Sequence, residues 1–222
     1  MLAVTADGRK LPPYVIFKRK MIPKEKFTSG IIIRVQDKGW MSADLMVDLI
    51  TTVWGLRPRA LLLPSLLVLD SFRGHLIDSG RRKLKKLRTE IAVTLGGLTS
   101  VLQPLDVSLN KPFKDNVRRL YTEWMAAGNY ALTPGGKIKR PSIEMLCGWI
   151  LEAWKMIPAE IIVKSFKKTG ISNRLDGTED HLLCDHDDDD AASGIEDATI
   201  VRSRSLPTLS EVKVKRNNKL KA

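Results

Sequence analysis

The stretch 65-SLLVLDSFRGH-75, together with 90-EIAVT-94, decides the fold that this sequence predicts. Residues 65–70 form a compact apolar run that ends in an acid, which is typical of a buried strand. Residues 77–87 predict a strongly basic helix, and residues 90–94 predict another strand. A strand, a helix and a strand in that order form one crossover unit, so the two strands should be parallel. The pattern indicates an α/β protein.

Further strands and a helix are expected before this unit. Residues 2–5 and 14–17 predict two antiparallel strands joined by a loop, because the turn-forming sequence ADG lies between them. Residues 31–35 predict another strand. Ser42 is a candidate N-cap for a helix over residues 43–54. Its predicted apolar face contains Leu45, Val47, Leu49 and Ile50.

The residues after this unit predict a helical C-terminal part. A long helix is expected over residues 107–127, and a second one follows Pro141 and runs through Lys155. A third helix should run from Pro158 to Lys168 and end at Gly170. The expected apolar face of the second helix contains Leu146, Trp149, Ile150, Ala153 and Trp154.

Composition divides the chain into a folded part and a tail. The length of 222 residues suits one domain, which we place at residues 1–183. Residues 185–190 read DHDDDD, and Ser, Arg and Lys dominate from there to the end. Few large apolar residues remain in this part, so residues 184–222 are expected to form a disordered tail, first acidic and then basic.

Charge and cysteine content limit the classes of function. The formal net charge is +12, which favours a polyanionic partner such as nucleic acid, although a highly charged surface without such a partner gives the same balance. Cys147 and Cys184 are too few and too far apart for a disulfide framework or a cysteine zinc site. The longest apolar run, residues 60–69, is too short to cross a bilayer, so no membrane association is expected.

Asp70 and Asp106 are the candidate site residues. Asp70 ends a predicted strand, and ligands of open α/β sheets bind at that edge. Asp106 begins the long helix, and the chain between the two acids can return to the same edge. Two carboxylates there suit a hard divalent cation. On its own, Asp70 is better explained as a helix N-cap or turn aspartate, and Asp106 is as good an N-cap as a metal ligand, so the residues alone leave both interpretations open.

Four segments together carry a resemblance to a known family. They are MLAVTADGRKLPPYVIFK, LLVLDSFRGH, GGLTSVLQPLDVSLNKPFK and SFKKTGISNRLDGTEDHLL. In order and spacing they resemble the DDE domain of pogo/Tigger-type transposases and of the host proteins derived from them. The resemblance covers residues 1–183.

This resemblance implies an RNase H-like fold, a mixed sheet flanked by helices. It also implies three acids that hold two Mg²⁺ or Mn²⁺ ions. Asp70 matches the second acid and Asp106 the third. The first acid belongs to a strand upstream of the 2–17 hairpin, so we expect this chain to lack both that acid and the central strand of the sheet. Asp7, Asp37, Asp44 and Asp48 are not at matching positions.

Basic residues predict where nucleic acid would lie. Arg81, Arg82, Lys85 and Lys86 are on the predicted 77–87 helix, and Leu84 and Leu87 can face the sheet beneath them. The remaining candidates are Arg73, next to Asp70, and Lys111 and Lys114 on the long helix. Contact with phosphates is one interpretation of these cations, and an ordinary solvated surface is the other.

Three functions remain open from the sequence. The first is a transposase-derived nuclear domain that binds DNA without sequence preference and lacks catalysis. The second is a fragment of an active metal-dependent transposase or endonuclease. The third is a module that binds other proteins through the same scaffold. The basic end KVKRNNKLK is a candidate nuclear import signal.

Overall fold

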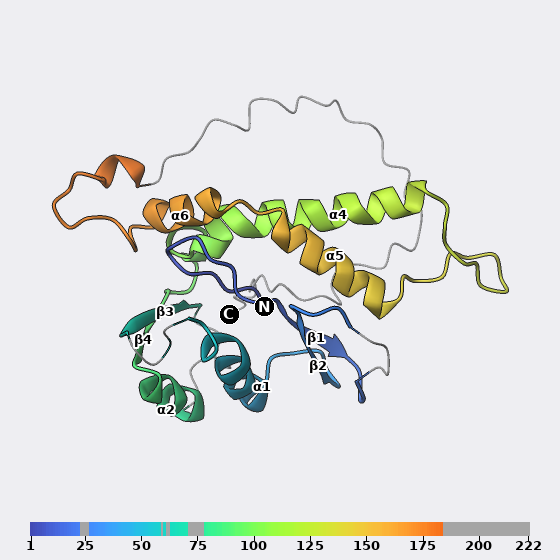
Figure 1. Ribbon diagram of the computed structural model, residues 1–222, viewed down its shortest axis with the longest axis horizontal. Helices are drawn as coiled ribbons and strands as arrows, with labels where there is room; N and C mark the ends of the chain where they lie inside the picture. The colour runs from blue at the N-terminus through green and yellow to red at the C-terminus, as the bar shows by residue number, and fades with distance from the viewer. Residues whose placement is uncertain (23–26, 59, 61–62, 71–77, 184–222) are drawn as a thin grey trace, which may run out of the picture.

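The computed structural model of the chain describes residues 1–22, 27–58, 60, 63–70 and 78–183. Helices α4, α5 and α6 form an upper layer in Figure 1, and two pairs of strands lie below them with helices α1 and α2. The α/β class is therefore confirmed. The predicted tail, residues 184–222, lies outside the described residues.

Strands β1 (Tyr14–Lys18) and β2 (Ile32–Gln36) form a parallel pair in register from Tyr14↔Ile32 to Lys18↔Gln36. The antiparallel pairing of residues 14–17 with residues 2–5 was therefore wrong. Residues 1–5 instead run antiparallel to residues 9–14, and we call residues 1–14 the N-terminal arm. Its backbone bonds include Thr5 N to Arg9 O (3.0 Å) and Leu11 N to Ala3 O (2.9 Å).

The crossover unit is confirmed almost to the residue. Strand β3 (Ser65–Leu69) is followed by helix α2 (Asp78–Lys86) and strand β4 (Thr89–Val93). The two strands are parallel, in register from Ser65↔Thr89 to Leu69↔Val93. The repeated apolar residues of both strands and the amphipathic helix between them account for this agreement.

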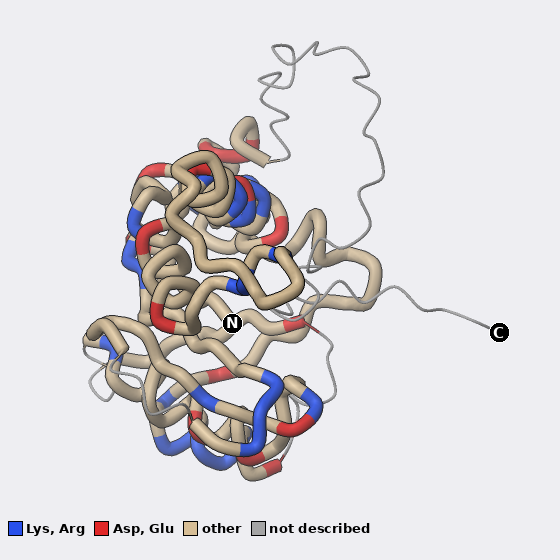
Figure 2. The backbone as a smooth tube through the Cα atoms, turned by 90° about the vertical axis from the view of Figure 1, so that its right-hand side faces the viewer, with Lys and Arg blue, Asp and Glu red and all other residues tan. Residues whose placement is uncertain are grey.

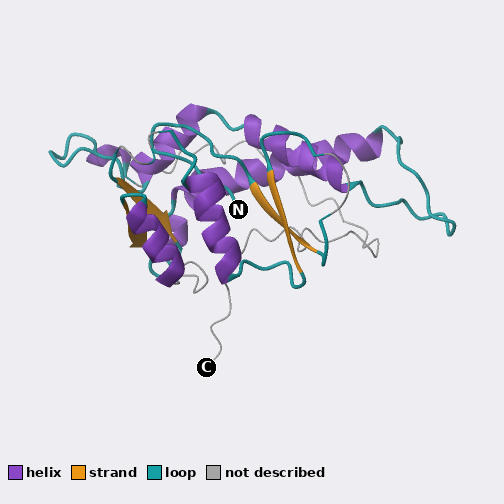
Figure 3. Cartoon of the chain, turned by 60° about the horizontal axis from the view of Figure 1, so that its bottom comes forward, coloured by secondary structure: helices purple, strands orange, loops and turns teal. Residues whose placement is uncertain are grey.

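The described strands form two separate two-stranded sheets instead of one mixed sheet. Figure 3 shows the two orange strand pairs well apart, with helices between them. Among the described residues, antiparallel pairing is limited to the isolated bridges Val4↔Lys10 and Leu132↔Ile138. The expectation of a single mixed sheet is not met here, since no described strand joins the two pairs.

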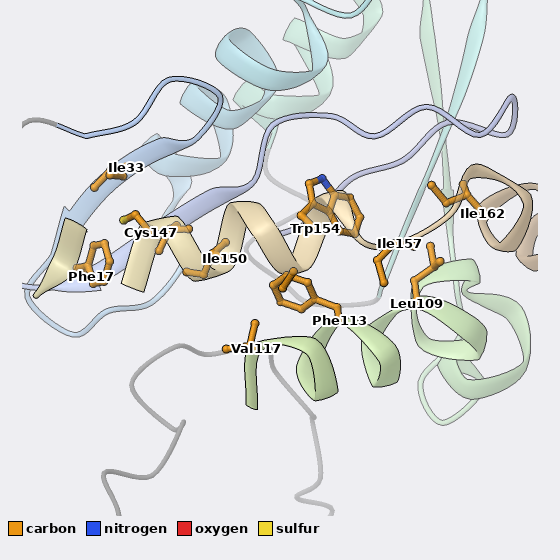
Figure 4. Close-up of a cluster of buried hydrophobic side chains, with 12 residues drawn as sticks. Phe17, Ile33, Leu109, Phe113, Val117, Cys147, Ile150, Trp154, Ile157 and Ile162 are labelled. Atoms are coloured by element: carbon orange, nitrogen blue, oxygen red, sulfur yellow. The ribbon is translucent and has the colours of Figure 1, made fainter. Parts of the chain in front are cut away.

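Strand β1 lies between two hydrophobic cores. Successive side chains of a strand point to opposite faces. Val15 and Phe17 accordingly pack in the core formed with α4 and α5, which also contains Trp154 and is drawn in Figure 4. Tyr14 and Ile16 pack in the second core, with helix α1 and Leu69.

Helix α1 (Ala43–Leu49) continues into a π-helical turn, Ile50–Trp54. The predicted cap is confirmed, because Ser42 Oγ accepts a hydrogen bond from Leu45 N at 3.3 Å. Leu45, Leu49 and Ile50 of the predicted apolar face pack in the second core, whereas Val47 is half-buried and is not part of it. The buried side chains are Met46, Leu49, Ile50, Val53 and Trp54.

The second half of the described chain is helical, as predicted. A short helix α3 (Thr99–Leu102), which the sequence did not indicate, precedes the π-helix η3 (Leu105–Leu109) and helix α4 (Asn110–Ala126). Helices α5 (Ile143–Lys155) and α6 (Ala159–Lys168) follow, and Asp180–Leu182 forms a final 3₁₀ turn. Leu146, Ile150, Ala153 and Trp154 of the predicted face pack in the first core, whereas Trp149 is half-buried and is not part of it. Its buried side chains are Cys147, Ile150, Leu151, Ala153 and Trp154.

The N-terminal arm is held against this helical layer. Lys10 Nζ donates to the carbonyl oxygens of Trp154, Lys155 and Ile157 at 2.8–3.0 Å and so satisfies the carbonyl end of α5. Trp154 Nε1 donates to Leu11 O at 3.0 Å. Gly8 has a φ of +88°, and a Cβ there would come within 3.2 Å of Ala159. The arm tip therefore packs closely on α6.

An ionic network joins β1, β2 and α1. Arg34 donates to both carboxylate oxygens of Asp48, at 2.8 and 3.0 Å, and Tyr14 Oη donates to Asp48 at 2.7 Å. Burial alone would raise the pKa of Asp48, but these hydrogen bonds hold it below the ordinary value. Burial and the same carboxylate raise the pKa of Tyr14. This network fixes the α1 side of the β1–β2 sheet.

Within the described ranges, no helix is both long and apolar enough to cross a membrane.

Candidate nucleic-acid and metal site

A cavity of about 560 Å³ lies between the N-terminal arm, strands β1 and β3, and the start of the long helix. Residues 1–6 and 65–70 line it as two continuous runs. The remaining lining is largely apolar and includes Leu49, Val53, Trp54, Leu105, Phe166 and Ile171. The cavity therefore borders both sheets and both ends of strand β3.

Asp70 follows the last residue of β3 and is half-buried on the cavity wall. The strand end is held by Leu69 O, which accepts hydrogen bonds from Thr94 N at 2.8 Å and from Thr94 Oγ1 at 3.2 Å. The structure thus places the Asp70 carboxylate where the sequence predicted it, at the carboxyl edge of a parallel strand.

Asp106 lies in η3, on the wall of the same cavity. Its Oδ1 accepts a hydrogen bond from Asn110 Nδ2 at 2.7 Å, and its backbone N donates to Gln103 O at 2.9 Å. The predicted helix over residues 107–127 consists of the π-helix η3, which begins two residues earlier at Leu105, and the α-helix α4 that follows it. Single π-turns inside helices occur frequently at functional sites. The structure therefore brings both predicted acids to one cavity.

The side chains of Asp70 and Asp106 offer oxygen atoms as donors to a metal ion. Besides the two carboxylates, the side chains of Gln103 and Asn110 line the cavity, and the sequence reasoning did not identify either amide. Oxygen ligands suit Mg²⁺ and Mn²⁺. Among the described residues, no three acids, histidines or cysteines are grouped closely enough to hold a metal ion.

The opposite end of β3 carries a positive charge that the sequence reasoning also missed. Arg57 is 8% exposed, lies 4.1 Å over the Trp54 ring and donates to Trp54 O at 2.7 Å. It also donates to Ser65 Oγ and to Thr89 Oγ1. Burial lowers the pKa of this guanidinium. The cavity is therefore lined by the Arg57 cation, which contacts Ser65, and by two acids, Asp70 and Asp106.

Helix α2 presents a basic face to solvent. Leu84 is fully buried and Gly80 is buried, whereas four cations are exposed: Arg81, Arg82, Lys85 and Lys86. Figure 2 shows Lys and Arg positions gathered in the lower part of the molecule, the level at which Figure 1 draws α2. Lys111 is exposed and Lys114 half-buried on α4, and Arg73 lies outside the described residues. The predicted orientation of the α2 helix is confirmed.

Comparisons with known proteins identify relatives over most of the chain. The profile of the family described as "DDE superfamily endonuclease" matches residues 1–166. A human protein named "Pogo transposable element with KRAB domain" is 45% identical over 185 residues, and its mouse counterpart is 44% identical over 183. Each of these alignments covers 82% of this chain and 30% of the relative.

A second human protein, "Pogo transposable element with ZNF domain", is 28% identical over 123 residues, or 55% of this chain and 9% of the relative. This chain thus spans less than a third of the length of these relatives. No solved structure matches it significantly. Because the family profile covers three quarters of the sequence, from the N-terminal arm into α6, this chain belongs to the DDE superfamily endonuclease family and is similar to pogo transposable-element proteins.

Proposed function

We propose that this chain is a transposase-derived domain that binds duplex DNA without sequence preference. The observation that carries the proposal is the exposed basic face of α2, which places Arg81, Arg82, Lys85 and Lys86 on one helix of a DDE-family domain. Lys111 and Lys114 on α4, and Arg73 from the sequence, are further candidate phosphate contacts. Cations that contact phosphates release counterions, so binding is strongly dependent on salt.

We propose further that the described residues supply only part of the metal site that DNA cleavage requires. Asp70 and Asp106 correspond to the second and third acids of an RNase H-like site. Two carboxylates bind a single Mg²⁺ or Mn²⁺ ion weakly, and two-metal strand cleavage needs a further ligand set. The two acids alone therefore support ion binding without strand cleavage.

The α2 interface is tested by replacing its four exposed cations with Gln. Each lost phosphate contact reduces the slope of log K against log salt by about 0.9, so the slope of the fourfold variant should fall by about three to four. This slope is measured by fluorescence anisotropy with a random-sequence duplex. The salt concentration is varied between about 50 and 200 mM, where the affinity for DNA depends steeply on salt.

The matched control replaces four exposed cations near the β1–β2 sheet: Lys18, Arg19, Lys20 and Lys38. It has the same net charge as the α2 variant, so a general charge effect would lower both slopes equally. Equal losses in the two variants would contradict a defined interface on α2. An unchanged slope in the α2 variant would contradict it as well.

Whether the purified chain cleaves DNA is tested with a plasmid-nicking assay in the presence of Mg²⁺ or of Mn²⁺. We expect no cleavage above background from the purified chain, and the same result from Asp70→Asn and Asp106→Asn. Cleavage that is lost in both aspartate variants would refute the proposal and would identify the chain as a working endonuclease.

The nucleus is the compartment in which we propose this domain acts, since its similarity is to transposable-element proteins and its sequence ends in a basic segment, KVKRNNKLK. A fluorescent fusion of the full chain should accumulate in nuclei. Exclusion of the fusion from nuclei would contradict this proposal.

A further inference from the structure

Four aromatic side chains pack on one another where α4 and α5 are joined. Tyr121 and Trp124 come from α4, Tyr130 from the loop that follows it and Trp149 from α5, and we call these four residues the aromatic cluster. The Trp124 ring touches the other three, with centroid distances of 5.6–5.8 Å. Neither hydrophobic core of the described residues contains any of the four, so the cluster is a separate feature of the helical layer.

The aromatic cluster lies at the molecular surface. All four of its residues are half-buried, whereas the core aromatic Trp154 is 3% exposed. Each ring therefore keeps part of its surface accessible to solvent. Figure 1 shows the end of α4, the start of α5 and the loop between them at the opposite end of the molecule from α2. The cluster and the basic face of α2 are thus two distinct surfaces.

The central ring of the cluster has a hydrogen-bond donor without an acceptor. Trp124 Nε1 is buried and finds no hydrogen-bond partner among the described residues. Buried indole N–H groups usually have one, and Trp154 Nε1, for example, donates to Leu11 O. A ligand suited to this cluster therefore combines a flat π-face with hydrogen-bond acceptors, and nucleic-acid bases have both.

A basic β-hairpin, residues 131–139, directly adjoins the cluster. Lys139 N donates to Ala131 O at 2.8 Å, and Ala131 follows the loop aromatic of the cluster. Lys137 lies on the same face of the hairpin as Lys139, because alternate residues of a strand share a face. Both lysines are exposed, and residues 124–143 contain three cations and no acid. The surface beside the aromatic rings is therefore positively charged.

We propose that the aromatic cluster and the adjoining hairpin form a binding site for single-stranded nucleic acid. Bases stack on the accessible parts of the rings, and Lys137 and Lys139 contact the phosphates. Aromatic rings beside a cationic track bind single strands with little sequence preference, because every base has a π-face. A duplex keeps these faces stacked inside itself. This site goes beyond duplex binding by α2 and does not depend on it.

The charge of the region favours this ligand over a peptide. Aromatic-lined grooves also bind proline-rich peptides, which require no cations at the site. Residues 118–144 carry five cations and two acids, and one of these acids, Glu123, already lies 3.8 Å from Arg119. The excess of positive charge is complementary to a polyanion. A proline-rich peptide therefore serves as the competitor in the test.

The first measurement uses a fluorescein-labelled oligothymidylate of about 12 nucleotides, a length within the range of single-strand sites. We expect saturable binding by fluorescence anisotropy. With the unlabelled strand, binding should quench part of the tryptophan fluorescence, because bases stack on Trp124 and Trp149. A duplex of the same length should leave the tryptophan fluorescence unchanged. Absence of quenching by the single strand, or equal quenching by the duplex, would overturn the proposal.

Variants of the loop tyrosine test stacking. Tyr130→Leu should weaken oligothymidylate binding roughly tenfold, because one stacking ring is lost. Tyr130→Phe keeps the ring and should bind as the parent chain does. The control Trp40→Leu removes an aromatic side chain that is 39% exposed outside the cluster, and it should leave binding unchanged. Equal weakening by Leu and Phe at residue 130 would show that stacking is not involved.

A pair of exposed lysines tests the site without altering the packing of the rings. Each phosphate contact to a single strand contributes about 0.7 to the slope of log K against log salt, so Lys137→Gln with Lys139→Gln should reduce the slope by about 1.4. Lys18→Gln with Lys20→Gln gives the same net charge and should leave the slope unchanged. Equal reductions in the two double variants would contradict a defined site at the hairpin.

The outcomes separate this site from the α2 interface. The fourfold α2 variant should keep the quenching by oligothymidylate, which would support two independent surfaces. Loss of single-strand binding with the duplex salt slope intact overturns the cluster site alone. Displacement of bound oligothymidylate by a proline-rich peptide would assign the aromatic cluster to a protein partner and would overturn the proposal as well.

Discussion

The two small sheets have similar composition but very different surroundings. Strand β1, YVIFK, has three of its five side chains buried, and Tyr14 is 1% exposed. Strand β3, SLLVL, is more apolar, yet only Leu69 is buried. The burial of a strand is thus set by what packs around it, and hydrophobic sequence alone does not secure it.

The difference can be traced to the neighbours of each strand. β1 pairs with β2, packs on α4 and α5 through one face and on α1 through the other, and is bonded to Met1 at its first residue. β3 pairs with β4, and its edge away from β4 faces the cavity. Substitutions that remove equal amounts of side chain from the two regions should therefore have unequal effects.

The largest effect is expected in the core beside β1. Trp154 is 3% exposed, and its ring meets that of Phe113 edge-on, with centroids 6.0 Å apart. Trp154→Ala should lower the free energy of unfolding by about 3–5 kcal/mol, because it leaves a cavity and an unpaired Leu11 carbonyl. Urea denaturation followed by circular dichroism measures the change. A loss below about 1 kcal/mol would contradict the central role of this core.

An intermediate effect is expected from Asp48→Asn, which removes the carboxylate that binds Arg34 and Tyr14. The free energy of unfolding at neutral pH should fall by about 1–3 kcal/mol, because hydrogen bonds to charged groups are lost. The exposed Asp37→Asn, outside any described ion pair, is the control and should change stability by less than about 0.5 kcal/mol.

The difference in unfolding free energy between the parent chain and the Asp48→Asn variant should depend on pH in a defined direction. The pKa of Asp48 is lowered in the folded state, so its carboxylate stabilises the fold above the unfolded-state pKa of about 4 and loses that contribution as pH falls through the lower folded value. The gap in unfolding free energy between the parent chain and the Asp48→Asn variant should be constant from about pH 5 to pH 8 and shrink below about pH 4. A gap that widens in acid would show that the network is not ionic.

The smallest effect is expected at the open edge of β3. Leu66→Ala removes a side chain that is 53% exposed and should change the free energy of unfolding by less than about 1 kcal/mol. Ile33→Ala in β2, where the side chain is 8% exposed, should cost about 2–4 kcal/mol. Equal costs at the two positions would mean that β3 is covered in solution.

Local signals in the sequence predicted most of the elements. Ser42 caps the start of α1, Pro141 lies just before α5, and Gly170, with a φ of +73°, follows the end of α6. The β3–α2–β4 unit was also predicted correctly. The pairing of β1 was not, because a parallel partner is reached through residues 19–31, and no periodic pattern in that stretch indicates a crossover.

The candidate site was predictable in its acids and unpredictable in its surroundings. Asp70 and Asp106 follow from their positions at a strand end and a helix start. Gln103, Asn110 and Arg57 have no comparable signal, because each reaches the cavity only through the packing of separate elements. The stacking of Arg57 on Trp54 depends on a turn whose geometry no local motif specifies.

The position of β1 between the two cores has a consequence for cooperativity. Val15 and Phe17 belong to one core and Tyr14 and Ile16 to the other, so neither core can open without exposing the other. The described part of the chain should consequently melt in one transition, with equal calorimetric and van't Hoff enthalpies. Strand β1, which has five residues, thereby couples the unfolding of the two hydrophobic cores.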